Sequence, residues 1–139
     1  MAVAWDDVQR ILETTKTIAV VGLSDKPDRD SYQIASYLQQ QGYRIIPVNP
    51  RIKEVLGEKA YPRLRDVPDP VDVVDIFRRS EDVPPIVEDA IAIGAKVVWM
   101  QSGIVNEEAA ARAEAAGLAV IMDACMRSAH RTLRASGRI

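Results

Sequence analysis

The segment that decides the fold is TIAVVGLSDKPDRDSY, residues 17–32. It opens with Thr17–Val21, an apolar run with β-branched residues, which is typical of a buried parallel strand. The strand ends at Gly22, a short polar loop follows, and a helix is expected to begin at Ser31. A loop followed by a helix N-terminus presents unpaired N–H groups and partial positive charge, so the segment predicts a phosphate-binding site.

The same loop carries two cations, Lys26 and Arg29, but not the glycines of a common dinucleotide site. That fingerprint is G-x-G-x-x-G, followed by an acidic residue after the next strand. Here the loop reads GLSDKP from Gly22, and the next strand ends in Val48-Asn49-Pro50. The sequence therefore argues against NAD as the ligand, and without a G-x-x-x-x-G-K-[ST] run it also argues against a P-loop NTPase.

Length and composition predict one folded domain over residues 1–139, with 47% hydrophobic and 27% charged residues. The net charge of −2 argues against a general nucleic-acid binder, which is expected to be basic. A single cysteine gives no internal disulfide, and no apolar run has the length of a membrane span. We expect a cytoplasmic protein without a membrane or nucleic-acid partner.

Apolar runs of strand length alternate with segments of helical periodicity along the whole chain. The predicted strands are Thr17–Val21, Tyr43–Val48, Val71–Phe77, Lys96–Met100 and Leu118–Met122. The predicted helices are Trp5–Thr14, Ser31–Gln41, Val83–Ile93, Asn106–Ala116 and a basic C-terminal helix from about Ala124. The stretch Arg51–Pro70 is predicted to be a structured loop with a short helical turn near Leu64.

This alternation predicts an α/β, Rossmann-like three-layer sandwich, with a five-stranded parallel sheet in the order 3-2-1-4-5 and helices on both faces. In such a sheet the ligand binds outside the carboxyl ends of the strands, at the switch point expected between strands one and four. The residues at these ends are glycines, hydroxyls, amides and arginines. No paired carboxylate, histidine or activated cysteine is among them, so the edge predicts binding rather than catalysis.

The motifs in their order resemble the small CoA-binding proteins that consist of one Rossmann-type domain, and the chain is similar to the nucleotide-binding domain of the succinyl-CoA synthetase alpha subunit. The resemblance runs from about Thr14 to Leu133. The motifs that carry it are Val21-Gly22-Leu23-Ser24, Arg29-Asp30-Ser31-Tyr32, Pro47-Val48-Asn49-Pro50, Val73–Arg78, Trp99–Ile104, Asn106–Ala109 and Met122–Cys125. It implies that coenzyme A (CoA) or an acyl-CoA binds in the cleft, and it implies no established chemistry.

The residues of the strand ends suit the parts of CoA. The amides of Gly22, Leu23 and Ser24 and the helix start at Ser31-Tyr32 are expected at the diphosphate. For the 3′-phosphate we expect Lys26, Arg29 or the pair Arg78-Arg79, because guanidinium groups match phosphate oxygens. Val48, Asn49 with Pro50, and Phe77 are expected around the adenine, and the turn Met100-Gln101-Ser102-Gly103-Ile104 along the pantetheine arm.

Two other classes of function stay open. One is an enzyme, either a CoA-dependent transferase or ligase fragment or a divergent NAD(P)-dependent oxidoreductase. The other is a redox- or nucleotide-responsive regulator that uses its arginine-rich C-terminus. Cys125 and His130 do not share one helical face, so we expect a buried cysteine and a partly exposed histidine with structural roles.

Overall fold

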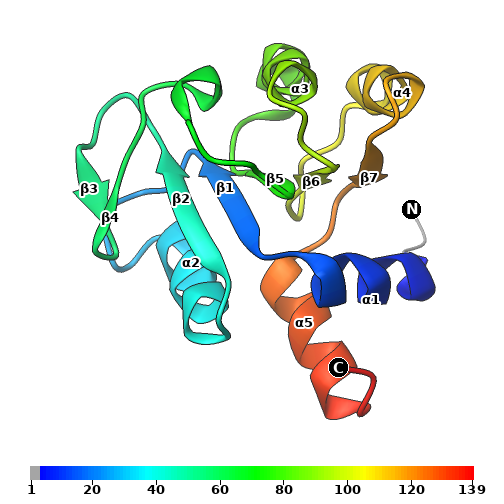
Figure 1. Cartoon of the computed structure of the whole chain (residues 1–139). Helices are drawn as coiled ribbons and strands as arrows, with labels where there is room; N and C mark the ends of the chain where they lie inside the picture. Colours follow the sequence, from blue (N-terminus) through cyan, green and yellow to red (C-terminus); the bar gives the residue numbers. More distant parts are fainter. Residues whose placement is uncertain (1–3) are drawn as a thin grey trace.

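A five-stranded parallel sheet forms the middle layer of the computed structural model, which describes residues 4–139 (Figure 1). Its strands are β1 (Thr17–Val21), β2 (Arg44–Val48), β5 (Val73–Ile76), β6 (Val97–Met100) and β7 (Ala119–Ile121). They lie in the order β2-β1-β5-β6-β7. The Rossmann-like fold class and the parallel sheet are confirmed. The predicted strand order is wrong, because the third main strand, β5, pairs with β1 instead of lying outside β2.

The segment after β2 explains this order. It forms a small hairpin of β3 (Glu54–Val55) and β4 (Glu58–Lys59), and then Tyr61 bridges to Val48 beside the end of β2. The Tyr61 amide donates to the Pro47 carbonyl, and the Asn49 amide donates to the Tyr61 carbonyl. The outer edge of β2 is therefore occupied at its carboxyl end, and the chain crosses back through a 3-10 turn, η1 (Leu64–Asp66), to the free edge of β1.

Two separate apolar cores lie on the two faces of the sheet. One face is covered by α1 (Trp5–Thr14), α2 (Asp30–Gln40) and α5 (Met126–Ala135), and the other by α3 (Val83–Ala92), α4 (Glu107–Ala115) and η1 (Figure 1). Along β1, Ile18 and Val20 enter the first core, while Ala19 and Val21 enter the second. Right-handed connections in opposite directions along a sheet lie on opposite faces, which is why α2 and η1 are separated by it.

The hairpin β3–β4 was not predicted from the sequence. Its turn is Leu56-Gly57, and both residues have positive φ, at 56° and 76°. Two such residues between short strands form the turn type that suits a tight hairpin. The predicted helical turn near Leu64 is confirmed as η1. A second 3-10 turn, η2 (Ser80–Asp82), leads into α3.

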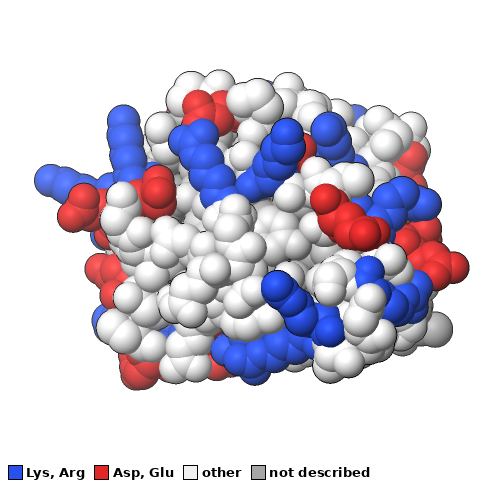
Figure 2. Space-filling model, turned by 60° about the horizontal axis from the view of Figure 1, so that its bottom comes forward, with Lys and Arg blue, Asp and Glu red and all other residues white. Residues whose placement is uncertain are grey.

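The outer surface of α2 and α5 has a distinctive charge distribution. Seen from below the view of Figure 1, charged side chains surround a largely uncharged middle area (Figure 2). The sequence of α2 contains no charged residue after Asp30.

Within residues 4–139, no helix is long and apolar enough to cross a membrane.

Candidate ligand-binding site

The carboxyl edge of the sheet contains a switch point between β1 and β5, not between β1 and β6 as predicted. From β1 the chain continues into α2 on one face, and from β5 it continues into α3 on the other. Two neighbouring strands that send their loops to opposite faces leave a crevice between these loops. Gly22 lies at the end of β1, and Arg78 lies just beyond β5. Two cavities meet at this crevice.

The first, which we call the loop cavity, has a volume of about 640 Å³ and lies against the loop between β1 and α2. Eight of the residues predicted from the sequence line it: Gly22, Ser24, Lys26, Arg29, Ser31, Asn49, Phe77 and Arg78. The sequence prediction missed the others, which are Asp25, Asp28, Asp30, Arg51 and Ile52. Arg51 directly follows the Asn49-Pro50 strand end, and this position was the signal that could have identified it.

Gly22 lets β1 and β5 approach each other at the mouth of this cavity. Its φ is +90°, and a Cβ built on it would lie 2.4 Å from the Phe77 carbonyl oxygen. Real Cβ atoms do not come so close to a backbone oxygen, so a side chain here would push the two strand ends apart. The nearest constraint on a side chain at position 22 is therefore the backbone of Phe77, just beyond β5.

Two of the loop amides that were expected to hold a diphosphate already have protein partners. The Gly22 amide donates to the Val48 carbonyl at 2.9 Å, and the Ser24 amide donates to Ser31 Oγ at 3.0 Å. The Lys26 amide in turn donates to Ser24 Oγ at 3.1 Å. Each serine oxygen therefore accepts from an amide and keeps its own O–H proton available for an anion.

The N-terminus of α2 supplies the remaining donors. The helix begins at Asp30, one residue earlier than predicted, and its N-cap Arg29 makes no side-chain capping bond within residues 4–139. The N–H groups of the first helical turn have no partner inside the helix and carry partial positive charge. They open beside Ser31, which lines the loop cavity.

Four cations line the loop cavity: Lys26, Arg29, Arg51 and Arg78. None of them forms an ion pair with any residue of the described chain. Three carboxylates, Asp25, Asp28 and Asp30, belong to the same wall, so the lining has a small positive excess rather than a strong one. Arg79 differs from its neighbour Arg78, because it is exposed and pairs with Asp82 and Glu81.

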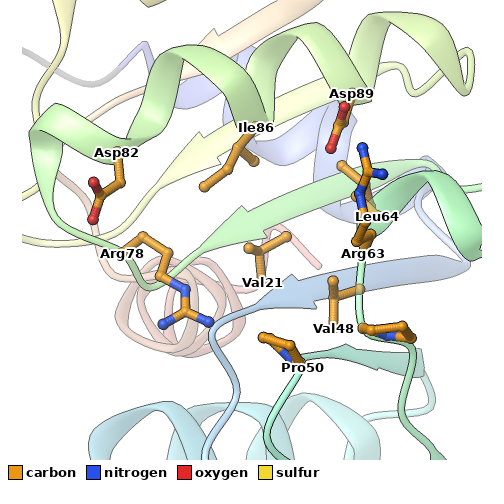
Figure 3. Close-up of a pocket in the computed structure, with 10 residues that line it drawn as sticks. Val21, Val48, Pro50, Arg63, Leu64, Arg78, Asp82, Ile86 and Asp89 are labelled. Atoms are coloured by element: carbon orange, nitrogen blue, oxygen red, sulfur yellow. The ribbon is translucent and has the colours of Figure 1, made fainter.

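The second cavity, which we call the sheet cavity, has a volume of about 320 Å³ and lies between the sheet and α3. Figure 3 shows Val21, Val48 and Ile86 facing it, with Arg78 at one end and Arg63 at the other. Its remaining lining residues are Pro50, Pro62, Leu64, Asp82 and Asp89. Apolar walls with polar ends suit a flat heteroaromatic ring, and Arg78 lines both cavities.

Eight predicted site residues line neither cavity: Leu23, Tyr32, Arg79, Met100, Gln101, Ser102, Gly103 and Ile104. Leu23 and Met100 are fully buried in the two cores. Ser102 and Gly103 are exposed, and the Gly103 amide donates to Asp123 Oδ1 at 2.6 Å. Ile104 lines a third, more open depression together with Phe77, Arg78, Arg79 and Asp82.

A buried carboxyl group lies just below the cleft and was not singled out from the sequence. Asp75, on β5, is 0% exposed, and Gln101 Nε2 donates to its Oδ1 at 2.5 Å. Burial raises the pKa of Asp75 to about 7, and the Gln101 hydrogen bond opposes this shift. A single aspartate inside the apolar run Val73–Phe77 was the signal that could have identified it.

His130 and Cys125 do not form a pair of reactive groups. His130 is buried, its Nδ1 lies 2.8 Å from the Tyr37 hydroxyl, and burial with the nearby Arg134 lowers its pKa. Cys125 is half-buried at the N-cap of α5. The burial of the two side chains is thus the reverse of the prediction. Within residues 4–139, no cluster of His, Cys, Asp and Glu could hold a metal ion.

The chain shares its sequence and its fold with several known proteins. It is 48% identical over 124 residues to the uncharacterized protein YneT of Bacillus subtilis, covering 89% of this chain and 92% of YneT. A solved structure of a hypothetical protein from Pyrococcus horikoshii OT3 matches 96% of this chain and 94% of that chain, with a TM-score of 0.92 and 43% identity. The chain is also 33% identical over 101 residues to the ADP-forming acetate–CoA ligase II of Archaeoglobus fulgidus, but it spans only 15% of that ligase.

The family predicted from the motifs is confirmed. The family model described as "CoA binding domain" matches residues 16–131, which is most of the chain and includes the strand ends that form the cleft. The chain therefore belongs to the CoA-binding domain family.

Proposed function

We propose that this protein binds CoA or an acyl-CoA in the cleft at the carboxyl edge of the sheet, as a binding, carrier or sensor module that makes and breaks no bond. The observation that carries this proposal is the set of four cations in the loop cavity, which have no ion-pair partner within residues 4–139. Cations that form no ion pair and lie beside a helix N-terminus suit a ligand with several phosphate groups. CoA, with a diphosphate and a 3′-phosphate, is such a ligand.

The two cavities suit different parts of this ligand. The diphosphate would bind at the N-terminus of α2, with the hydroxyl groups of Ser24 and Ser31 as further donors. Arg29, Lys26 or Arg78 would meet the 3′-phosphate. The adenine would lie near Val48, at the entrance of the sheet cavity, and the pantetheine arm would extend past Phe77 toward Ile104.

The names of the relatives support CoA as the ligand, but they do not extend ligase activity to this chain. The acetate–CoA ligases that it resembles are named for CoA, and the chain spans between 12% and 19% of their lengths. The lining of the loop cavity has carboxylates but no histidine or cysteine. These observations favour reversible binding over the catalytic alternatives.

The deciding experiment is calorimetric titration of the full chain with CoA, dephospho-CoA, NAD and NADP. We expect CoA to bind and the two nicotinamide nucleotides to give no signal. The matched variants are Arg78→Ala and Arg79→Ala, because these neighbours differ in exposure and in ion pairing. Arg78→Ala should lower the affinity for CoA by about tenfold or more, as expected for the loss of one phosphate contact, and Arg79→Ala should have little effect on it.

NAD binding without a CoA signal would overturn the proposal. Equal losses in the two arginine variants would instead place the anion outside the loop cavity. The mass spectrum of protein purified under native conditions adds an independent readout, because a bound acyl-CoA would show both the ligand and its acyl group.

A further inference from the structure

Asp75 is a fully buried carboxyl group in the middle of the sheet, with one oxygen unused. Its register partners are Val20 on β1 and Trp99 on β6, which belong to the apolar core under α2 and α5. Oδ1 accepts the Gln101 hydrogen bond, whereas Oδ2 is buried without any hydrogen-bond partner in the described chain. Burying a polar atom without a partner is costly, so this arrangement needs a physical explanation.

The side chain of Gln101 determines which oxygen of Asp75 is free. Its Nε2 donates to Asp75, and its Oε1 faces the amide of Met126, the first residue of α5, at 3.4 Å. The N-cap of α5, Cys125, makes no side-chain capping bond within residues 4–139. Turning the Gln101 amide over would set an NH₂ group against this N–H, so Oδ1 stays an acceptor and Oδ2 is the atom that can take a proton.

Asp75 lies close beneath the cleft. Phe77, two residues after Asp75 and just beyond β5, lines the loop cavity. Val20, the register partner of Asp75 on β1, lies two residues before Gly22. Two residues of a strand span about 7 Å. Leu23, which follows β1, is fully buried in the same core as Val20 and Trp99. A charge in the cleft therefore acts on the carboxyl group partly through the protein interior, where screening by water is weak.

We propose that Asp75 takes up a proton from solvent when an anionic nucleotide binds in the cleft and returns it when the ligand leaves. The proposal rests on the proposed function, because it needs phosphate groups in the loop cavity. Negative phosphate charges disfavour the ionised form of a nearby carboxyl group relative to its protonated form. On protonation, Oδ2 gains an O–H bond to a proton from solvent, and no other bond changes. Binding of the ligand is thereby linked to pH.

The surroundings of Asp75 make it responsive in the physiological range. Burial raises its pKa to about 7, and no charged side chain contributes to that shift. The titratable groups on this face are Cys125 and His130 at α5, Tyr32 and Tyr37 on α2, and Tyr43 before β2. The α5 helix also carries three cations, of which Arg127 is half-buried and Arg131 and Arg134 are exposed. The charged residues of α1 are exposed, and α2 has none after Asp30.

The expected shift follows from Coulomb's law. One negative charge about 10 Å away, acting through an effective dielectric constant of about 20, raises a carboxyl pKa by about one. Near pH 7.5 such a rise corresponds to an uptake of about half a proton per bound ligand.

The test is calorimetric titration with CoA at pH 7.5 in buffers of different ionisation enthalpy, for the unchanged protein, Asp75→Asn and Asp72→Asn. Asp72 is a matched control, because it precedes β5 at the opposite edge of the sheet and hydrogen-bonds to the Lys16 and Thr17 amides. The phosphates of CoA also titrate, but equally in all three proteins. We expect the unchanged protein and Asp72→Asn to take up about half a proton more than Asp75→Asn.

A second measurement does not depend on the variant being folded. In protein labelled with ¹³C at its aspartate carboxyl carbons, the chemical shift of the Asp75 carboxyl carbon should titrate near pH 7. The midpoint of this titration should rise when CoA is added. CoA binding with equal proton uptake in all three proteins, or with an unmoved midpoint, overturns this inference and leaves the proposed function intact. No CoA binding to the unchanged protein overturns both.

Discussion

The two edges of the sheet use charge in opposite ways. At the amino edge, Asp72 accepts from the amides of Lys16 and Thr17 and pairs with Lys96, and Arg44 pairs with Asp69. At the carboxyl edge, Arg29, Arg51, Arg63 and Arg78 line cavities, and none of them has an ion-pair partner within residues 4–139. These charges at the amino edge are paired within the protein, whereas the cations at the carboxyl edge are available to an anionic ligand.

This difference separates residues that hold the fold from residues that are open to a ligand. Charges that are paired in the free protein contribute a little to stability, whereas unpaired cations in a crevice contribute mostly when an anion arrives. Substitutions at the amino edge should therefore change the free energy of unfolding and leave ligand affinity unchanged. Substitutions of the cleft cations should do the reverse.

The largest expected effect is at Gly22, where fold and site depend on the same residue. Gly22→Ala should lower the free energy of unfolding by about 4 kcal/mol, because it combines a positive-φ penalty with a backbone clash. Gly103→Ala is the matched control at the same edge, since Gly103 also has positive φ but open space around it, and should cost about 1 kcal/mol. Urea unfolding of both variants measures the difference, and equal losses would show that the close approach of β5 is unimportant.

The next effect is the pH dependence that Asp75 gives to stability. A folded-state pKa of about 7, above the ordinary value, means that the folded protein binds more protons than the unfolded one between about pH 4 and 7. The free energy of unfolding should therefore fall by about 3 kcal/mol as pH rises from 5 to 8, and Asp75→Asn should remove that fall. Unfolding curves at several pH values test this, and an unchanged slope in the variant would place the titration elsewhere.

Much of the fold could be predicted from the sequence, because its signals are local. The apolar runs, and the glycines and asparagines at the ends of strands and helices, identified the five main strands and their helices. The strand order was predicted wrongly, because it depends on the bridge between Tyr61 and Val48. This is a contact between two segments, and the local sequence of neither segment indicates it. The hairpin turn Leu56-Gly57 was missed because only one of its two positive-φ residues is a glycine.

The site was predicted in part for the same reason. Residues directly after strands, such as Gly22, Asn49 and Arg78, do meet in the cleft. The sequence could not show that Ser31 Oγ already accepts from the Ser24 amide, because that bond depends on how the loop folds back on α2. Nor could it show that Gln101 turns inward to Asp75 instead of outward to the cleft.

A smaller effect sharpens the role of the cleft cations. Arg29→Ala should lower the affinity for CoA by about tenfold, and that for dephospho-CoA by much less, if the guanidinium group contacts the 3′-phosphate. Stability should stay unchanged, because Arg29 is exposed and has no ion pair in the described chain. Titration of the variant with both ligands measures the ratio, and equal losses would move Arg29 to the diphosphate.

Asp72→Asn applies the comparison to the other edge. The variant should lose about 1 kcal/mol of stability at pH 7, because a charged acceptor for two amides and for Lys96 becomes neutral. Although burial opposes it, the backbone hydrogen bonds from Lys16 and Thr17, with Lys96, lower the pKa of Asp72 below its ordinary value. Its stabilisation is therefore present above about pH 4 and is lost as pH falls through the lowered pKa, which acid unfolding of the variant would show.

The smallest effect belongs to the ion pair between Arg44 and Asp69, at the start of β2. The Arg44 side chain is 53% exposed, so solvent screens the attraction, and Arg44→Gln should change the free energy of unfolding by less than about 0.5 kcal/mol. CoA affinity should be unchanged at every salt concentration, whereas that of Arg29→Ala should depend less steeply on salt than that of the unchanged protein. A salt series of titrations on both variants compares the two edges directly. A changed salt dependence in Arg44→Gln would show that the amino edge also attracts the ligand.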